Sequence, residues 1–144
     1  MKKIDKIFSK TKSMSLDEYL EKVLYEKNIG YYQTNNPFGS KGDYVTAPNI
    51  SNIFCEMIAI WLVSFWKNLK KPKYLNFVEL GPGNGDLCLV LIKTLKNFPE
   101  AHDSIKIFLY EKSEKLIKIQ KKRILSKKVS WIQNLNTIKK GPVV

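Results

Sequence analysis

The strongest constraint on this chain is a short apolar run that breaks into three alternating glycines. Residues 77–86 read FVELGPGNGD, so the run carries a carboxylate at Glu79 and continues into Gly81, Gly83 and Gly85. Glycine lets a backbone approach a bound ligand closely because no Cβ intervenes. A simple tight turn is the alternative, and the flanking segments decide between the two.

The flanking segments alternate between strand and helix patterns. Three short apolar runs have the composition of strands: residues 74–80, 105–111 and 128–133. Amphipathic helical patterns fill the intervals at 85–98 and 113–125. Such alternation predicts right-handed βαβ units and a parallel sheet, and therefore an α/β fold. In these sheets ligands bind beyond the carboxyl ends of the strands, where the glycine turn lies.

The first half of the chain is predicted to be helical around one long loop. One helix is predicted over about 16–28, with a capping box at its start and Gly30 as the stop that follows it. A second helix, which is apolar nearly all round, is predicted over 51–69. The loop between them, residues 30–51, is rich in Gly, Pro, Asn and Tyr. Loops of this length are usually functional or disordered.

The glycine turn differs from a dinucleotide fingerprint at its last position. Its spacing is G-x-G-x-G, and Asp86 stands where the fingerprint places a third small residue. We expect Asp86 to cap or open the following helix. A carboxylate there is unfavourable beside a pyrophosphate, which binds the free N–H groups of a helix N-terminus. An NAD- or FAD-dependent oxidoreductase is therefore the less favoured enzyme class.

Two carboxylates at strand ends fit an adenosine ligand with a cationic tail. Glu111 closes the second strand, where a carboxylate accepts hydrogen bonds from ribose hydroxyls, although it could also be a surface residue among lysines. Glu79 either orients the turn or lies near the cationic end of the ligand. S-adenosylmethionine has a ribose for Glu111, a cationic tail for Glu79 and no phosphate, and it is therefore the predicted cofactor. The predicted cofactor-binding residues of this region are Glu79, Gly81, Gly83, Gly85 and Glu111.

The positive charge of the chain does not predict nucleic-acid binding. The net charge is +12, and residues 112–144 carry ten basic residues against one acid, Glu114. The basic residues recur at helix-like intervals, which is typical of the solvated face of an amphipathic helix. Arg123 is the only arginine, whereas specific phosphate and guanine contacts favour arginine.

Membrane, metal and disulfide classes are also disfavoured. Residues 53–66 are strongly apolar but too few to span a bilayer, and they contain Glu56, so a buried helix is predicted. His102 is the only histidine, which leaves no metal-ligand cluster. Cys55 and Cys88 lie far apart in apolar helical segments and are predicted to be buried free thiols in a reducing compartment.

Several stretches resemble the MidA-type class I methyltransferases. They are GYYQTNNPFGSKGDYVTAPNISNIF at 30–54, FVELGPGNGDL at 77–87, and LYEKSEKLIKIQKKRI at 109–124 followed by VSWIQ. The long loop is the most specific part. The family includes the mitochondrial arginine methyltransferase that assists respiratory complex I assembly. The resemblance implies a Rossmann-like sheet with added N-terminal helices, arginine on a protein as substrate, and a cofactor pocket lined in part by Gly42, Asp43 and Thr46.

The sequence differs from the family pattern in two places. The loop of the family usually reads T-x-P-E-I-S, but position 49 here is Asn49. The family continues into further strands, whereas this chain stops in what should be the fourth. We therefore expect residues 1–70 to form a helical segment with a cofactor-covering loop, and 71–144 the N-terminal half of a SAM-binding domain with about three strands.

The end of the chain bears on the expected activity. Catalytic residues are expected beyond residue 144, and the chain alone is not expected to transfer methyl groups. A binding or assembly protein that keeps the fold without turnover is the non-enzyme alternative. A bacterial cytoplasm is the expected location, with the mitochondrial matrix as the alternative.

Overall fold

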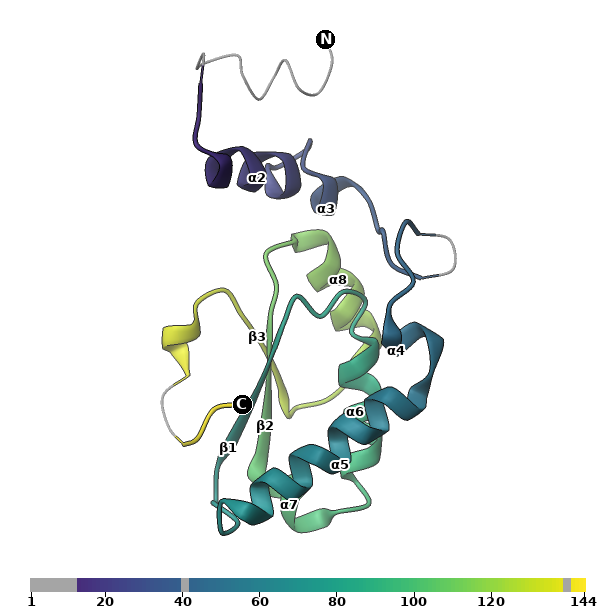
Figure 1. Ribbon diagram of the computed structural model, residues 1–144, viewed down its shortest axis with the longest axis vertical. Helices are drawn as coiled ribbons and strands as arrows, with labels where there is room; N and C mark the ends of the chain where they lie inside the picture. The colour runs from purple at the N-terminus through teal and green to yellow at the C-terminus, as the bar shows by residue number, and fades with distance from the viewer. Residues whose placement is uncertain (1–12, 40–41, 139–140) are drawn as a thin grey trace.

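Strands and helices alternate in the second half of the chain, as the sequence predicts (Figure 1). The computed structural model describes residues 13–39, 42–138 and 141–144. The strands are β1 (Leu75–Leu80), β2 (Ile105–Tyr110) and β3 (Val129–Ile132). The longer helices are α2 (Leu16–Tyr25), α5 (Asn52–Asn68), α6 (Asp86–Leu95), α7 (Pro99–Ser104) and α8 (Glu114–Arg123). The short ones are α3 (Tyr31–Thr34), α4 (Ala47–Ile50) and the 3-10 helix η1 (Leu135–Thr137).

The three strands form one parallel sheet in the order β1-β2-β3, which confirms the predicted α/β architecture. Leu75 of β1 pairs with Ile105 of β2, and Ile107 pairs with Val129 of β3. Side chains alternate along a strand, so Ile105, Ile107 and Leu109 share one face, and all three are buried.

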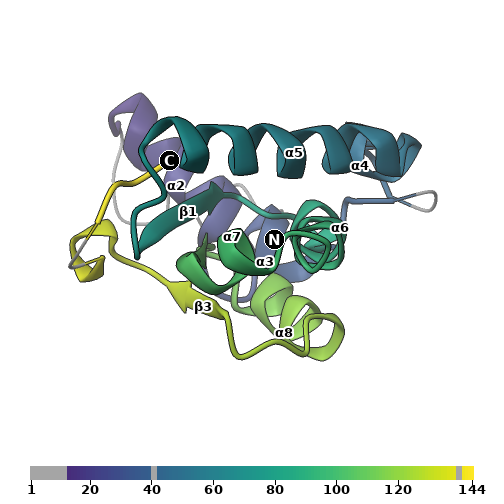
Figure 2. The same ribbon diagram turned by 90° about the horizontal axis from the view of Figure 1, so that it is seen from below.

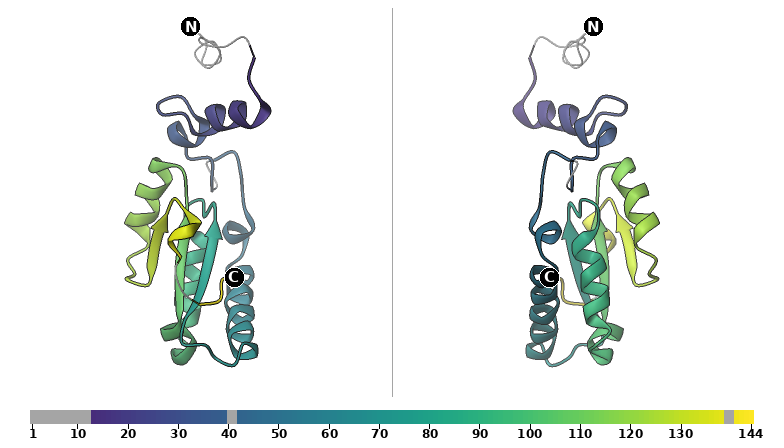
Figure 3. Two further views of the ribbon diagram at one scale, coloured as in Figure 1. Left: turned by 90° about the vertical axis from the view of Figure 1, so that its left-hand side faces the viewer. Right: turned by 90° about the vertical axis from the view of Figure 1, so that its right-hand side faces the viewer.

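That buried face is covered by a single layer of helices. The right-hand view of Figure 3 shows α6 in front of the sheet with α5 and α8 on either side, and Figure 2 places η1 across the opposite face. Leu62 of α5 and Leu91 of α6 are fully buried against the strands in one core. The prediction that the apolar stretch at 53–66 is a buried helix is therefore correct for one face only. The buried residues are Cys55, Ala59, Leu62, Val63 and Trp66, and the exposed ones are Ile53, Phe54, Met57, Ile60 and Trp61. No helix in the described ranges combines the length and apolarity needed to cross a membrane.

The strand β1 is an outer strand of the three-stranded sheet, and residues 142–144 pair with part of its open edge. Residues 142–144 run parallel to it on the side away from β2. Asn76 N donates to Pro142 O at 2.9 Å, Val144 N to Asn76 O at 2.9 Å, and Val78 N to Val144 O at 2.8 Å. Pro142 thus takes part only as an acceptor. This is the place expected for the start of a fourth strand.

The N-terminal helices lie across the carboxyl ends of the strands (Figure 1). The capping box of α2 is present, but the helix ends at Tyr25, three residues earlier than predicted, because the backbone of Glu26 is extended (ψ 133°). Gly30, predicted as a helix stop, instead precedes α3. Three hydrogen bonds attach α3 to the turn after β2 and to the start of α8. Ser113 Oγ donates to Tyr32 O and Lys115 Nζ to Thr34 O, both at 2.5 Å, and Gln33 Nε2 donates to Lys112 O at 3.3 Å.

Candidate functional site

The glycine turn connects β1 to α6 in a backbone conformation that side chains disfavour. Gly81, Gly83 and Gly85 have φ values of +66°, +54° and +81°. The N–H of Gly81 donates to Tyr110 O at 2.9 Å, which ties the turn to the end of β2. A Cβ built on Gly83 would lie 3.5 Å from the ring of Phe38, and one on Gly81 would meet no atom within 4 Å. The turn therefore leaves open space above the end of β1.

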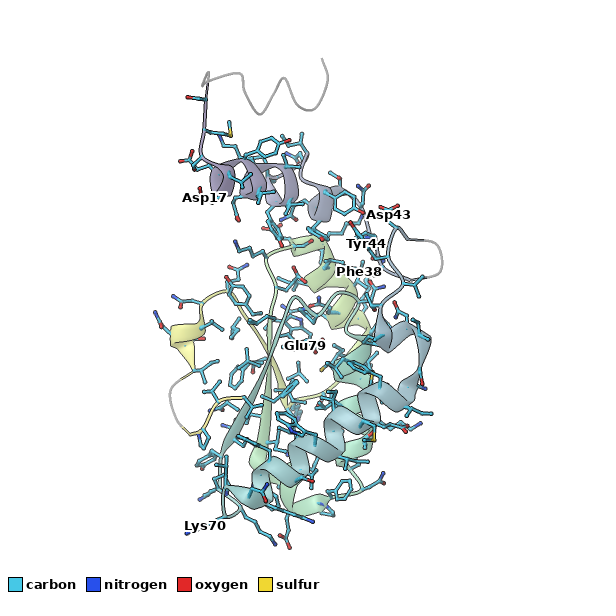
Figure 4. All side chains as sticks on the ribbon, viewed as in Figure 1. Asp17, Phe38, Asp43, Tyr44, Lys70 and Glu79 are labelled. Carbon is cyan, nitrogen blue, oxygen red and sulfur yellow. The ribbon has the colours of Figure 1, made fainter. Side chains whose placement is uncertain are left out.

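A cleft of about 130 Å³ occupies this space. Its walls come from the glycine turn, the start of α6 and the loop that precedes α5. Figure 4 shows Glu79 at the end of β1, with Phe38 on the loop side above it. The lining residues are Phe38, Thr46, Pro48, Glu79, Gly81, Pro82, Gly83, Asn84, Asp86 and Leu87.

Glu79 is a half-buried acid in the lining of this cleft. Its Oε2 atom is buried and has no hydrogen-bond partner among the described residues. Loss of solvent contact, with a smaller contribution from the nearby Asp86 carboxylate, raises the pKa of Glu79 to about 8. The same burial, with the Glu79 charge, raises the pKa of the Cys88 thiol to about 12. Cys55 and Cys88 are buried and free, as predicted.

Asn84 contributes a second buried acceptor to the cleft. Its amide nitrogen donates to Phe38 O at 3.3 Å, which leaves Oδ1 buried and, within the described part of the chain, unpaired. Buried polar groups are normally hydrogen-bonded, so two unpaired acceptors in one cleft require explanation. A ligand with several N–H donors would supply the missing partners.

Glu111 is placed differently from Glu79 because its carboxylate already has partners. It lies at the carboxyl end of β2 and is 5% exposed. Ser113 N donates to Oε1 at 2.8 Å and Gln120 Nε2 to Oε2 at 3.3 Å. Burial raises its pKa, and these hydrogen bonds oppose that shift. Glu111 is therefore not a surface carboxylate.

Gln120 connects the glycine turn to Glu111, and the sequence reasoning missed it. Its side chain is fully buried, and Nε2 also donates to Gly83 O at 2.7 Å. Its Oε1 accepts from Trp131 Nε1 at 2.8 Å, which brings in β3. The available signal was spacing, because Leu116, Gln120 and Ile124 fall at intervals of four on the inward side of α8.

The predicted cofactor-binding residues fall into two groups. Thr46 lines the cleft with Glu79, Gly81 and Gly83, whereas Gly42, Asp43, Gly85 and Glu111 lie outside its lining. The hydroxyl of Tyr31 donates to Asp43, and this bond raises the Tyr31 pKa above its usual range. Gly42 fits tightly against Pro37, because a Cβ there would overlap the Pro37 carbonyl.

Four aromatic rings pack one against the next on the loop side of the turn, with Tyr25, Tyr32 and Phe38 stacked and Tyr44 tilted against Phe38. The ring of Tyr32 lies 5.5 Å from that of Tyr25 and 6.2 Å from that of Phe38, and Phe38 lies 6.4 Å from Tyr44. The segments that carry these rings are distant in sequence from the glycine turn, yet Phe38 lies above Glu79 in Figure 4 and its ring would be 3.5 Å from a Cβ on Gly83.

Comparisons with known proteins agree with this geometry. A family model described as "Putative S-adenosyl-L-methionine-dependent methyltransferase" matches residues 57–144. The chain belongs to this family. The assignment confirms the resemblance found in the sequence and favours a methyl-donor cofactor over a dinucleotide.

Curated relatives carry a more specific name. The Xenopus laevis protein arginine methyltransferase NDUFAF7, mitochondrial, is 40% identical over 83% of this chain and 28% of its own length. The Xenopus tropicalis protein of the same name is 38% identical over 91% of this chain and 31% of its own length. The chain thus spans under a third of the length of these relatives.

A solved structure supports the fold. A Burkholderia thailandensis protein, solved bound to S-adenosyl-homocysteine, superposes with a TM-score of 0.67 at 24% identity. The match covers 90% of this chain and 35% of the other. It shows that the Rossmann-like sheet and its N-terminal additions form a known arrangement.

Replacement of Glu79 by glutamine should remove a pH dependence of stability. Because the folded-state pKa of Glu79 is raised, its contribution to stability is complete below its ordinary pKa of 4.5 and is lost as the pH rises through about 8. Between about pH 6 and pH 8.5, the free energy of unfolding of the unaltered chain should fall by about 2 kcal/mol more than that of Glu79→Gln. Urea unfolding at both pH values measures the difference. Equal losses would contradict the assignment, and Glu56→Gln on the exposed side of α5 is the control.

Replacement of Gln120 by leucine should destabilise the fold although the two side chains have similar volume. It would leave Gly83 O and Trp131 Nε1 without their partner and remove one donor from Glu111. Each buried group left unpaired costs about 1 to 3 kcal/mol, so we expect a loss of at least about 2 kcal/mol in urea unfolding. Trp131→Phe removes only one of the three bonds and should cost less. If both variants lost the same stability, the bonds of Gln120 to Gly83 and Glu111 would contribute nothing to the fold.

Proposed function

We propose that this chain binds S-adenosylmethionine and forms the cofactor-binding part of a methyltransferase that modifies arginine on a protein. The observation that carries the proposal is the pair of unpaired buried acceptors, Glu79 Oε2 and Asn84 Oδ1, in a cleft beyond β1. A cleft with two unpaired acceptors, one of them a carboxylate oxygen, is complementary to a cation that carries N–H groups.

The residues present fit the two ends of this cofactor. Glu79 and Asn84 would hold the amino-acid end, where the ammonium supplies donors to both. Glu111, one strand away, would accept hydrogen bonds from the ribose hydroxyls, since each of its oxygens has lone pairs beyond the one bond that it already accepts. The aromatic rings on the loop side of the turn would exclude water from the nucleoside side.

The protonation of Glu79 follows from this arrangement. With a pKa of about 8, its side chain is mostly neutral at pH 7 in the absence of a ligand. An ammonium beside it would favour the charged form, so binding should release a proton. The bound cofactor supplies an electrophilic methyl group, and the chain's own part in catalysis is to orient it.

The substrate and location are drawn from the relatives. Arginine on a protein partner is the acceptor in the names of the curated relatives. Those names also say mitochondrial, and two buried free thiols suit either the mitochondrial matrix or a bacterial cytoplasm. We propose a reducing compartment of one of these kinds.

Replacement of Glu111 by glutamine should weaken S-adenosylmethionine and S-adenosyl-homocysteine alike, because the ribose is common to both. Two charge-assisted hydrogen bonds are worth about 1.5 to 3 kcal/mol in total, or roughly ten- to a hundredfold in affinity. Isothermal titration calorimetry with both ligands measures the change, and Glu114→Gln at the exposed start of α8 is the matched control.

The calorimetry also tests the cofactor assignment itself. Binding of NADH in preference to S-adenosyl-homocysteine, or no binding of either S-adenosylmethionine or S-adenosyl-homocysteine, would refute it. A loss on Glu111→Gln confined to one of the two ligands would count against the ribose contact alone. Incorporation of labelled methyl groups into arginine of a protein acceptor is the corresponding test of the reaction.

A further inference from the structure

The carboxylate of Asp86 is held by two different elements, one on each oxygen. Asp86 is the first residue of α6 and, as predicted, opens that helix, but the cap position belongs to Gly85 and the Asp86 side chain does not cap. Arg123 Nη2 of α8 lies 2.6 Å from Oδ1, and Asn49 Nδ2 of α4 donates to Oδ2 at 2.6 Å. Since Asp86 also lines the cleft, it joins the cleft to both elements.

Asn49 extends this connection into the wall of the cleft. Its Oδ1 accepts from Thr46 Oγ1 at 3.2 Å, and Thr46 is one of the lining residues. The helix α4 has only four residues, so its own backbone hydrogen bonds fix it weakly. The position of this wall therefore depends on bonds to other elements, and the Asn49–Asp86 bond is the direct one to α6.

Arg123 fixes the orientation of Asp86. Its Nη1 donates to Asn84 O at 2.7 Å while Nη2 pairs with the carboxylate, so that one guanidinium spans the turn and the start of α6. A planar fork of this kind holds two acceptors in a set geometry, which lysine cannot do. The only arginine of the chain thus supports the group that Asn49 binds.

We propose that Asn49 is a positioning residue, which through Asp86 holds the cleft wall at residues 46–50 against the glycine turn and thereby sets the affinity for the cofactor. This inference rests on the proposed function. An amide suits the position because it donates to Asp86 and accepts from Thr46 at the same time. A carboxylate at position 49 would face Asp86 at hydrogen-bond distance and repel it.

An exchange of the two side chains tests the proposal. Asn49→Asp places two carboxylates together and should weaken S-adenosyl-homocysteine about tenfold, a change of about 1.4 kcal/mol. The double variant Asn49→Asp with Asp86→Asn restores one donor and one acceptor with their places reversed. It should bind within about threefold of the unaltered protein. Asn52→Asp, the same change on the exposed first turn of α5, is the control and should leave the affinity unchanged.

Two outcomes of the calorimetry would overturn the proposal. One is Asn49→Asp binding as tightly as the unaltered protein. The other is an exchanged pair that binds no better than Asn49→Asp, because a general disturbance of the fold would not be rescued by reversal of donor and acceptor.

Hydrogen exchange of the ligand-free protein separates this proposal from the cofactor assignment. The N–H groups of Asn49 and Ile50 bond to Thr46 O, and that of Ser51 to Ala47 O, so these amides report on the wall. They should exchange faster in Asn49→Asp and return toward the original rate in the exchanged pair. Unchanged exchange in Asn49→Asp would overturn the positioning role. Failure of the unaltered protein to bind S-adenosyl-homocysteine would instead refute the proposed function.

Discussion

The left-handed backbone of the turn between β1 and α6 is the constraint on which the rest of the site depends. It is held by β2 through the Gly81–Tyr110 hydrogen bond and by α8 through Gln120 and Arg123. The loop before α5 is attached to it through Asn84. Gly81, Gly83 and Gly85 all have positive φ, so a side chain at any of these positions would strain the backbone that brings these elements together.

The two carboxylates show opposite ways of placing an acid at a strand end. Glu111 receives hydrogen bonds from the backbone and from Gln120, so its site is complete before any ligand arrives. Glu79 has a buried oxygen with no partner among the described residues and a raised pKa, so its hydrogen bonding is incomplete in the absence of a ligand. One acid is preorganised and the other is held in an unfavourable state that a ligand would relieve.

The sequence predicted the parallel sheet and the place of the glycine turn because periodicity and turn chemistry are local properties. It did not predict α7 or η1, which are only six and three residues long. The sequence also predicted α2 to be too long, because the residues around Glu26 give no signal for the extended backbone that ends the helix there. Gln120 was missed for a different reason. A polar residue in a lysine-rich helix is expected to face solvent, and only the residues that surround it in space show that it is buried. Asn49 and Asp86 lie 37 residues apart in the chain, so their bond was equally out of reach.

The burial of Gln120 has a consequence for how this protein can diverge. Gly83 O, Glu111 and Trp131 each depend on the same amide. A change at position 120 removes a hydrogen-bond partner from the glycine turn, from the end of β2 and from β3 at once, whereas a change at Trp131 alone removes one bond. In an alignment of relatives that keep Glu111 and the glycine turn, position 120 should therefore vary less than its lysine-rich neighbours on α8. Where it does vary, position 131 should change with it.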